Sequence, residues 1–202
     1  MSVDQSWETI YKKAECVWGI KPDPLLSDQS LLPSQGKVLD LGMGEGRNAL
    51  FLAMNGYDVT GVDIAPSAVE KCLERAKSMG VTLVAKVSNL MDIEIEPNNY
   101  TLIISTMTLQ FLKKSEADTV ITRIKQGLQP GGMVYLSMFS TEDPSYKRAK
   151  ETLPELEQNT FYQERLASYM HFFEKQEILD HFADLELIRF NQEISLDTGH
   201  PG

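Results

Sequence analysis

The chain has 202 residues, of which 42% are hydrophobic and 24% are charged, and its formal net charge at pH 7 is −10. This length and composition are typical of one ordinary globular domain with a single core, and too short for two. The acidic balance argues against duplex DNA or RNA as a partner, because nucleic-acid binders need a basic face. It also argues against an anionic membrane surface.

No targeting or membrane-spanning segment is expected. The apolar runs are far shorter than the roughly 20 residues that a bilayer requires, and the N-terminus, with Asp4 and Glu8, lacks the pattern of a signal peptide. The two cysteines, Cys16 and Cys72, fall in separate helical patterns, so a disulfide is not expected. We therefore expect a cytoplasmic protein.

Apolar periodicity and Gly/Pro punctuation predict an alternation of helices and strands. In chain order we predict helices at 4–17 and 25–32, strand 37–41, helix 46–55, strand 58–62, helix 66–80, strands 82–87 and 100–105, helix 115–128, strand 133–139, helix 174–182 and strand 185–194. This alternation implies an α/β fold with a doubly wound, mostly parallel, Rossmann-like sheet and helices on both faces. Ligands of such sheets lie at the carboxyl ends of the strands, so we expect the strand ends to surround one crevice.

Residues 141–170 interrupt the alternation. The segment is polar, contains Pro144 and Pro154, and is longer than an ordinary connection. Phe161, Tyr162 and Tyr169 are large side chains that can pack. We therefore favour a lid-like insert that determines substrate specificity, and we disfavour a disordered surface loop. The whole chain, 1–202, is predicted to be one domain, in which 1–33 supply N-terminal helices.

The most informative stretch follows the strand at 37–41 and reads D-L-G-M-G-E-G-R-N, from Asp40 to Asn48. Glycines allow a ligand to approach the main chain, and an acid after the next strand, Asp63, can take both hydroxyls of a ribose. The unit is therefore built for a nucleoside. The dinucleotide fingerprint G-x-G-x-x-G requires a third glycine where Arg47 stands, so an NAD-type site is disfavoured.

The sequence D-L-G-x-G-x-G resembles motif I of class I S-adenosylmethionine (SAM) methyltransferases. Gly-Arg-Asn at 46–48, Asn-Gly-Tyr-Asp-Val at 55–59, the segment 100–112 and Pro-Gly-Gly at 130–132 are similar to the TehB, or tellurite-resistance, branch. The resemblance runs from about residue 5 to 198. It implies SAM as cofactor, S-adenosylhomocysteine as product, and transfer of a methyl group to a small-molecule acceptor, with a tellurite- or selenite-type oxyanion as one candidate.

The resemblance also implies roles for single residues around the glycine turn. Asp40 would organise the loop near the methionine part of SAM, whereas Gly42 and Gly44 would admit the ligand to the main chain. Asn48 could hydrogen-bond the SAM carboxylate. Asp63 would bind the ribose diol by charge-assisted hydrogen bonds, with Ile64 against the adenine ring. Gly46 is expected to serve helix packing.

The other strand ends complete the expected cofactor site. The amide oxygen of Asn89 can accept a hydrogen bond from the amino group of adenine, and the N–H of Leu90 can donate to a ring nitrogen. Carbonyls of Ser105, Thr106 and Met107 would face the methyl group. Tyr11 is expected to close over SAM. Trp7, in the first predicted helix, and Trp18, just after it, could do the same.

Two histidines are the candidates for catalysis. A general base is needed only if the acceptor must lose a proton. His171 precedes two phenylalanines and could face the acceptor, although a satisfied histidine in a hairpin is the alternative. His200 lies where the family carries pocket histidines and arginines. The scattered histidines and the lack of a C-x-x-C pattern predict no metal site.

One family element is missing. In this superfamily a last antiparallel strand enters the sheet, yet Gly199, Pro201 and Gly202 are poor strand residues. The chain therefore looks truncated at its C-terminus, or its sheet is closed in another way. We predict either an incomplete sheet or a partner chain, as in a homo-oligomer, that supplies the missing strand.

Two other functions stay open. One is an NAD-dependent oxidoreductase, which Arg47 at the position of the third glycine disfavours. The other is a SAM-binding sensor or interaction module without catalysis.

Overall fold

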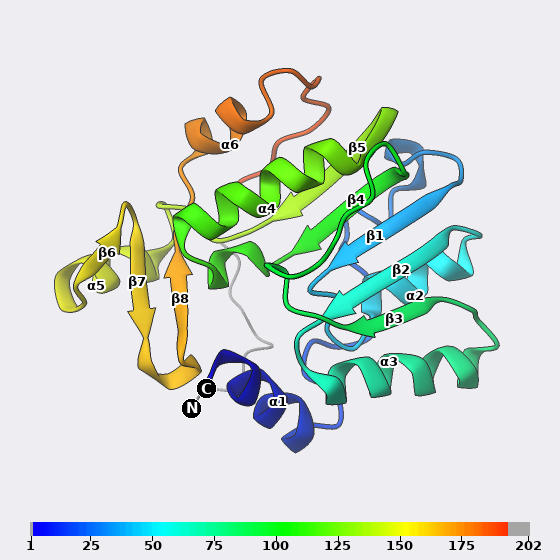
Figure 1. The fold of residues 1–202 in the computed structure, drawn as a ribbon, viewed down its shortest axis with the longest axis horizontal. Helices are drawn as coiled ribbons and strands as arrows, with labels where there is room; N and C mark the ends of the chain where they lie inside the picture. The colour runs from blue at the N-terminus through cyan, green and yellow to red at the C-terminus, as the bar shows by residue number, and fades with distance from the viewer. Residues whose placement is uncertain (1, 194–202) are drawn as a thin grey trace.

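A computed structural model describes residues 2–193 and has a five-stranded parallel sheet at its centre (Figure 1). The strand order is β3-β2-β1-β4-β5, with every neighbouring pair parallel. The strands are β1 Lys37–Leu41, β2 Asp58–Asp63, β3 Val84–Val87, β4 Tyr100–Thr106 and β5 Leu128–Ser137. The reversal of strand order between β1 and β4 is the switch point at which ligands of such sheets bind. The predicted α/β class and parallel sheet are confirmed.

Helices cover both faces of the sheet because alternate strand residues point to opposite sides. On one face, Leu39 and Ile103 pack against α4, Lys114–Gly127. On the other face, Val38 packs against α2, Arg47–Met54, and α2 in turn contacts α3, Pro66–Met79. The apolar runs of β1 and β4 are therefore buried on both sides, as expected for central parallel strands.

The N-terminal region differs from the prediction. Helix α1, Val3–Lys13, ends four residues early, because Ala14 takes an extended backbone conformation. The predicted helix at 25–32 is wrong; the structure has only a 3-10 turn, η1 Gln29–Leu31. Asp28 explains this, since its carboxylate accepts hydrogen bonds from the N–H and the hydroxyl of Ser30 and so holds a local turn.

The insert 141–170 is a folded unit beside the carboxyl ends of the strands (Figure 1). It comprises α5 Pro144–Thr152 and an antiparallel sheet of β6 Glu155–Glu157, β7 Thr160–Gln163 and β8 Ser168–His171. The rings of Phe161 and Phe172 form its core. The hydroxyl of Ser168 donates to the carbonyl of Phe111, so the insert is joined to the 3-10 turn η2, Leu109–Phe111, which follows β4. Its role as a lid stays a prediction.

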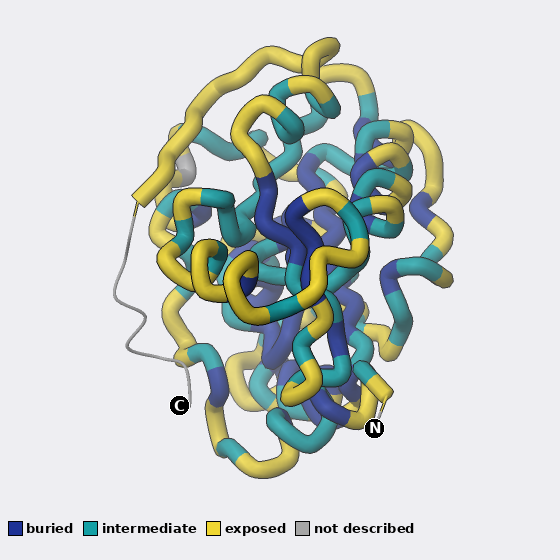
Figure 2. The backbone as a smooth tube through the Cα atoms, turned by 90° about the vertical axis from the view of Figure 1, so that its left-hand side faces the viewer, coloured by how far each residue is buried: buried dark blue, intermediate teal, exposed yellow. Residues whose placement is uncertain are grey.

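The end of the chain differs most from the prediction. Helix α6, Lys175–His181, is present, but the described part of the predicted strand at 185–194 is not a strand. Leu187 and Ile188 are each 58% exposed, and Figure 2 shows this stretch in yellow before the grey trace. A strand without a neighbour cannot pair its N–H and C=O groups, which is why an apolar pattern alone does not make one. Within the described residues the sheet ends at β5.

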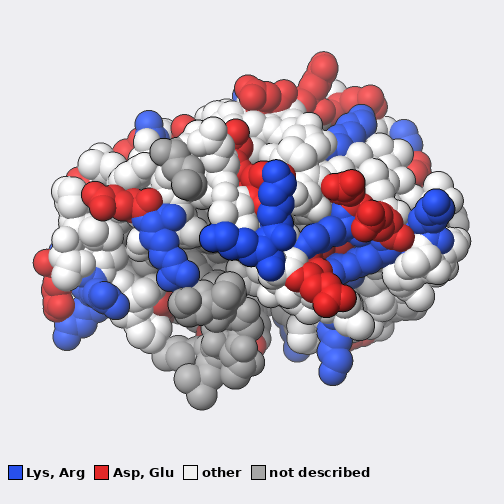
Figure 3. All heavy atoms as spheres, turned by 90° about the horizontal axis from the view of Figure 1, so that it is seen from below, with Lys and Arg blue, Asp and Glu red and all other residues white. Residues whose placement is uncertain are grey.

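The surface is mixed in charge where α1 and α3 lie. In the view of Figure 3, Lys and Arg side chains alternate with Asp and Glu side chains, and that face carries no uniformly basic area. None of the described helices combines the length and apolarity needed to cross a membrane.

Candidate functional site

The turn between β1 and α2 takes backbone conformations that glycine favours. Gly42, Gly44 and Gly46 have φ angles of +74°, +56° and +83°. At Gly46 a Cβ would lie 2.3 Å from Sγ of Cys72 in α3, so this residue serves helix packing as expected. The N–H groups of Gly42 and Met43 both donate to the carbonyl of Val62, each at 2.9 Å. The turn is thereby tied to the end of β2.

Asp63 connects the end of β2 to this turn. One carboxylate oxygen accepts the N–H of Gly44 at 2.8 Å and the other accepts the N–H of Ala65 at 2.9 Å. Burial raises the pKa of Asp63, and these backbone hydrogen bonds oppose that rise. The side chain is only 7% exposed, yet it lines the pocket described below. A fixed acid therefore faces the glycine turn, as the sequence predicts.

Asp40 lies beneath the turn rather than in the pocket wall. It is completely buried, and no described residue forms a hydrogen bond with either carboxylate oxygen by geometric criteria. Burial and the nearby charge of Asp63 raise the pKa of Asp40 to about 7, although Arg47 and the N–H of Ala49 act in the opposite direction. Asp40 can reach a ligand only through the loop that it supports.

One large pocket of about 1890 Å³ includes the carboxyl ends of the strands and continues along β5 to the segment 182–193. Pockets for one small ligand measure about 300–1,000 Å³, so a single small molecule would not fill this one. The predicted cofactor residues that line it are Tyr11, Gly42, Gly44, Asp63, Ile64, Asn89, Leu90, Thr106 and Met107. The predicted meeting of the strand ends in one crevice is confirmed. We call the part formed by Tyr11, Gly42, Gly44, Asp63 and Asn89 the glycine-turn end.

Asn48 and Ser105 do not line the pocket. The Asn48 side chain accepts the N–H of Asp23 at 2.8 Å and donates to the hydroxyl of Thr106 at 3.0 Å. The Ser105 hydroxyl donates to the carbonyl of Leu41 at 3.0 Å. Both side chains hold the walls of the site together. The predicted contact of the Asn48 side chain with the SAM carboxylate therefore finds no support here, whereas the predicted role of the Ser105 main-chain carbonyl stays a prediction.

Arg47 replaces Asn48 as the candidate partner of an anionic group. It is half-buried, lines the pocket, and forms no hydrogen bond or ion pair within the described part of the chain. In the sequence, Arg47 stands out only because it breaks the dinucleotide pattern. The signal that could have found it is its place at the first position of α2, directly after the glycine turn.

The N-terminal helix closes the glycine-turn end. The Tyr11 hydroxyl accepts the indole N–H of Trp18 at 2.8 Å, and a Cβ on Gly44 would lie 2.8 Å from that hydroxyl. Glu45 is buried and accepts the N–H of Val17 at 2.8 Å, an anchor that sequence analysis missed. Lys71 and Arg75 lie 3.4 and 3.6 Å from the same carboxylate.

Asn89 takes the position predicted for the adenine contact. Its side-chain oxygen already accepts the N–H of Met91 at 2.9 Å, which leaves a second lone pair for a ligand. Ile64 and Leu90 line the same part of the pocket. The arrangement fits a flat heterocycle between apolar side chains with one polar contact.

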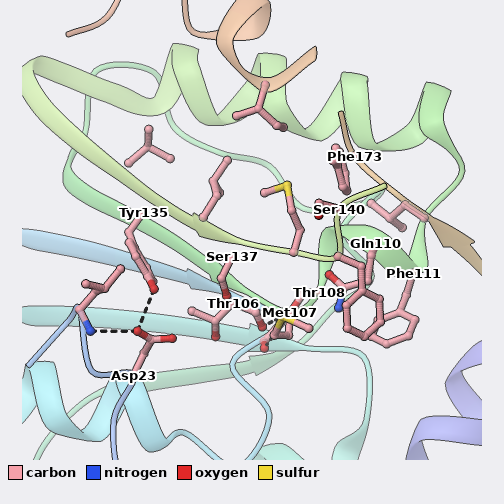
Figure 4. A pocket seen from close by; sticks show the side chains of 18 of the residues that line it. Asp23, Thr106, Met107, Thr108, Gln110, Phe111, Tyr135, Ser137, Ser140 and Phe173 are labelled. Carbon is pink, nitrogen blue, oxygen red and sulfur yellow. Dashed lines mark hydrogen bonds between the residues drawn. The ribbon is translucent and has the colours of Figure 1, made fainter. Parts of the chain in front are cut away.

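The ends of β4 and β5 form the other part of the pocket (Figure 4). We call it the β4–β5 end, defined by Thr106, Met107, Gln110, Ser137 and Phe173. Met107 has a φ of +52°, and its N–H donates to the carbonyl of Ser137 at 2.8 Å. Gln110 and Ser137, which sequence analysis did not single out, have buried polar atoms without a partner among the described residues.

The structure does not place His171 in the pocket. The ring is completely buried, with Nδ1 2.9 Å from the hydroxyl of Thr160 and Nε2 3.2 Å from the carboxylate of Glu177. Its edge packs on Phe173, with centroids 4.3 Å apart. The satisfied histidine, our alternative, matches this geometry, and a catalytic role finds no support. The other candidate, His200, lies outside the described residues.

One cluster could hold a metal ion by its residue types: Asp118, Glu177 and His181. The ammonium group of Lys114 lies 2.9 Å from Asp118 and 2.9 Å from Glu177. A cation of the protein itself therefore already neutralises these acids, and we assign no metal to them.

The glycine-turn end fits SAM by its donor set. At Gly44 the main chain lacks a Cβ, which suits the methionine arm of SAM. The carboxylate of Asp63, fixed by backbone hydrogen bonds, suits the ribose diol. The guanidinium of Arg47, beside this end in the pocket lining, suits the carboxylate of SAM.

Comparison with known proteins gives an independent line of evidence. The profile of the family described as "Tellurite resistance protein TehB" matches residues 26–171. A "Probable S-adenosyl-L-methionine-dependent methyltransferase TehB" of Haemophilus influenzae is 31% identical over 117 residues, which cover 57% of this chain and 41% of that protein. "Hemagglutinin 1" of Eikenella corrodens is 27% identical over 79% of this chain and 47% of its own length. The chain thus spans less than half of each relative.

Solved structures share the fold. A SAM-dependent methyltransferase from Methanosarcina mazei has a TM-score of 0.74 at 23% identity, covering 89% of this chain and 93% of that one. TehB from Haemophilus influenzae has a TM-score of 0.68 at 23% identity, covering 93% and 58%. At this identity the likeness establishes the methyltransferase-like fold alone.

Proposed function

Because the chain belongs to the TehB family, in its SAM-dependent methyltransferase branch, we propose that it transfers a methyl group from SAM to a small-molecule acceptor. The observation that carries the proposal is the contact between Asp63 and Gly44, at 2.8 Å, in the wall of a pocket that a single small molecule would not fill. It joins the acid that suits a ribose to the bare main chain that suits the methionine arm. S-adenosylhomocysteine is the expected product.

SAM would supply a methyl group on a positively charged sulfur. Asp63 would hold the ribose, the loop 42–44 would lie against the amino-acid arm, and Arg47 would pair with the carboxylate. Asn89 and Leu90 would hold the adenine. Holding donor and acceptor in contact provides much of the acceleration of such a displacement, and no described titratable group is required to touch the methyl group.

The name of the family offers an oxyanion of the tellurite or selenite type as one acceptor. That choice rests on resemblance, and the fold does not select an acceptor. A non-catalytic SAM sensor and an NAD-dependent oxidoreductase remain the competing functions. The former would bind SAM without releasing S-adenosylhomocysteine, and the latter would bind NAD.

Calorimetry tests the proposal. SAM and S-adenosylhomocysteine should bind and NAD should not. The substitution Asp63→Ala should weaken SAM binding by about 1–3 kcal/mol, the range for hydrogen bonds to charged groups. The matched control is Asp58→Ala, the same change at the exposed first residue of β2, and it should leave the affinity unchanged.

Two results would contradict the proposal. Binding of NAD with no binding of either sulfur nucleoside would remove it. Equal SAM affinity in Asp63→Ala and the native chain would mean that the ribose lies elsewhere.

A further inference from the structure

Gln110 is in an unusual position for a polar side chain. It lies in the 3-10 turn η2, Leu109–Phe111, directly after β4, and it lines the pocket. It is 0% exposed, and neither its amide nitrogen nor its amide oxygen has a hydrogen-bond partner among the described residues. A buried amide without partners is costly, and each such group in a native protein requires an explanation.

A second unpartnered group lies in the same part of the pocket. The Ser137 hydroxyl, at the end of β5, is buried and has no partner among residues 2–193. Gln110 and Ser137 come from neighbouring strand ends, and Figure 4 shows both among the side chains that surround the pocket, with Met107 and Phe173. Together they offer uncharged donors and acceptors beside apolar surface, which is the usual make-up of a small-molecule site.

The charges around the pocket restrict what can enter. The described lining of the whole pocket contains ten Asp and Glu side chains, of which Glu45 is paired with Lys71 and Arg75, and Asp184 with Lys125. It contains three Lys and Arg side chains, Arg47, Lys175 and Arg189. Arg47 belongs with the glycine turn, the ammonium of Lys175 lies 4.4 Å from the ring centroid of Phe190, and Arg189 is exposed. An acid-rich cleft raises the local concentration of cations and lowers that of anions. An oxyanion would find no converging Lys or Arg side chains at the β4–β5 end among the residues that the structure describes.

We propose that the β4–β5 end binds the methyl acceptor through Gln110 and Ser137, and that this acceptor is a small amine rather than an oxyanion. The inference rests on the proposed methyl transfer. The amide oxygen of Gln110 accepts an N–H of the amine, and the amide N–H groups and the Ser137 hydroxyl serve its other polar atoms. The acidic lining draws the protonated amine towards the pocket.

The chemical step balances without a further reactant. The protonated amine first gives one proton to water. The nitrogen lone pair then forms the bond to the methyl carbon while the carbon–sulfur bond breaks, and the electrons of that bond stay on sulfur as a neutral thioether. The methylated ammonium leaves with the positive charge that the sulfonium carried, or releases a proton to water.

The first test replaces the amide with an apolar side chain of similar size. Gln110→Leu should keep the native affinity for S-adenosylhomocysteine in calorimetry, and it should raise the melting temperature by about 2–4 °C because it removes a buried, unpaired amide. The matched control is Gln126→Leu, the same change at an exposed position of α4, which should leave both quantities unchanged.

The second test measures release of S-adenosylhomocysteine with ethanolamine and histamine as amine probes and sodium selenite as the oxyanion probe. At least one amine should react faster than selenite, and Gln110→Leu should raise its KM about tenfold with a smaller effect on kcat. Faster turnover of selenite, or no turnover of either amine, would overturn the acceptor class.

A lower melting temperature in Gln110→Leu with an unchanged KM would overturn the role of Gln110. Loss of S-adenosylhomocysteine binding in the native chain would instead contradict the proposed function itself, so the two failures are distinguishable.

Discussion

The two ends of the pocket are built in different ways. At the glycine-turn end, Gly42, Gly44 and Asp63 come from 22 consecutive residues of one β-α-β unit, and backbone hydrogen bonds hold them. At the β4–β5 end, Gln110, Ser137 and Phe173 come from segments far apart in the sequence, and the side-chain polar groups of the first two have no hydrogen-bond partner within residues 2–193. A cofactor shared by a family can be held by a short motif, whereas a particular acceptor is read by distant side chains.

Two acids outside the pocket wall should make stability respond to pH with opposite sign, and the larger effect is expected at Asp40, beneath the glycine turn. Its pKa is raised in the folded chain from an ordinary value of 3.8 to about 7. The folded state therefore binds more protons than the unfolded state between these values, and stability falls as the pH rises through this window. At 1.36 kcal/mol per pKa unit the loss by pH 7 is up to ~4 kcal/mol.

Urea unfolding of the native chain and of Asp40→Asn between pH 4 and 8 measures this effect. The variant should be the more stable protein at pH 7, and the difference should shrink towards pH 4. A native chain that is no less stable than the variant at pH 7 would show that a cation or hydrogen bond compensates Asp40. Asp58→Asn, at an exposed position, is the control.

Glu177, which adjoins the insert, should act in the opposite direction. Burial alone would raise its pKa, but hydrogen bonds from His171 and Lys114 outweigh burial and lower the pKa from 4.5 to about 2. The stability that it contributes, on the order of 3 kcal/mol by the same conversion, is fully present above pH 4.5 and is lost as the pH falls towards 2. The native chain and Glu177→Gln should therefore converge in stability as the solution is acidified. Parallel stability profiles would refute the pairing.

Gly46 tests how tightly the glycine-turn end is packed. Gly46→Ala places a side chain at a φ of +83° and 2.3 Å from Sγ of Cys72, so we expect a loss of about 2–3 kcal/mol from backbone strain and crowding. Gly80→Ala separates the two causes, because Gly80 has a φ of +67° with no atom near the added Cβ. It should lose only about 1–2 kcal/mol. Equal losses in urea unfolding would mean that Cys72 moves aside freely.

The fold was predicted well where a short local motif determines the structure, and poorly where distant segments must meet. The bounds of β1 agree with the prediction, because its apolar run ends at the glycine turn. The antiparallel sheet of the insert was not predicted, since strands of three or four residues carry too little pattern. The predicted strand at 185–194 had a strand-like composition, but a strand also needs a neighbour, and no local pattern supplies one.

The site divides similarly. The position of Asp63 in the pocket wall could be predicted from its place at the end of β2, because a parallel sheet brings strand ends together. The hydrogen bonds of Asn48 could not, because the sequence gives its position but not its partners, Asp23 and Thr106. Gln110 was missed because the sequence does not show that its amide is buried without a hydrogen-bond partner among the described residues.

The closure of the pocket by the N-terminal region has a practical consequence. The chain has two tryptophans, Trp7 and Trp18, and both line the pocket. Its intrinsic fluorescence therefore originates at the mouth of the site. Binding of a nucleoside there should change the tryptophan emission directly, so that occupancy of the site can be followed by fluorescence without an attached dye.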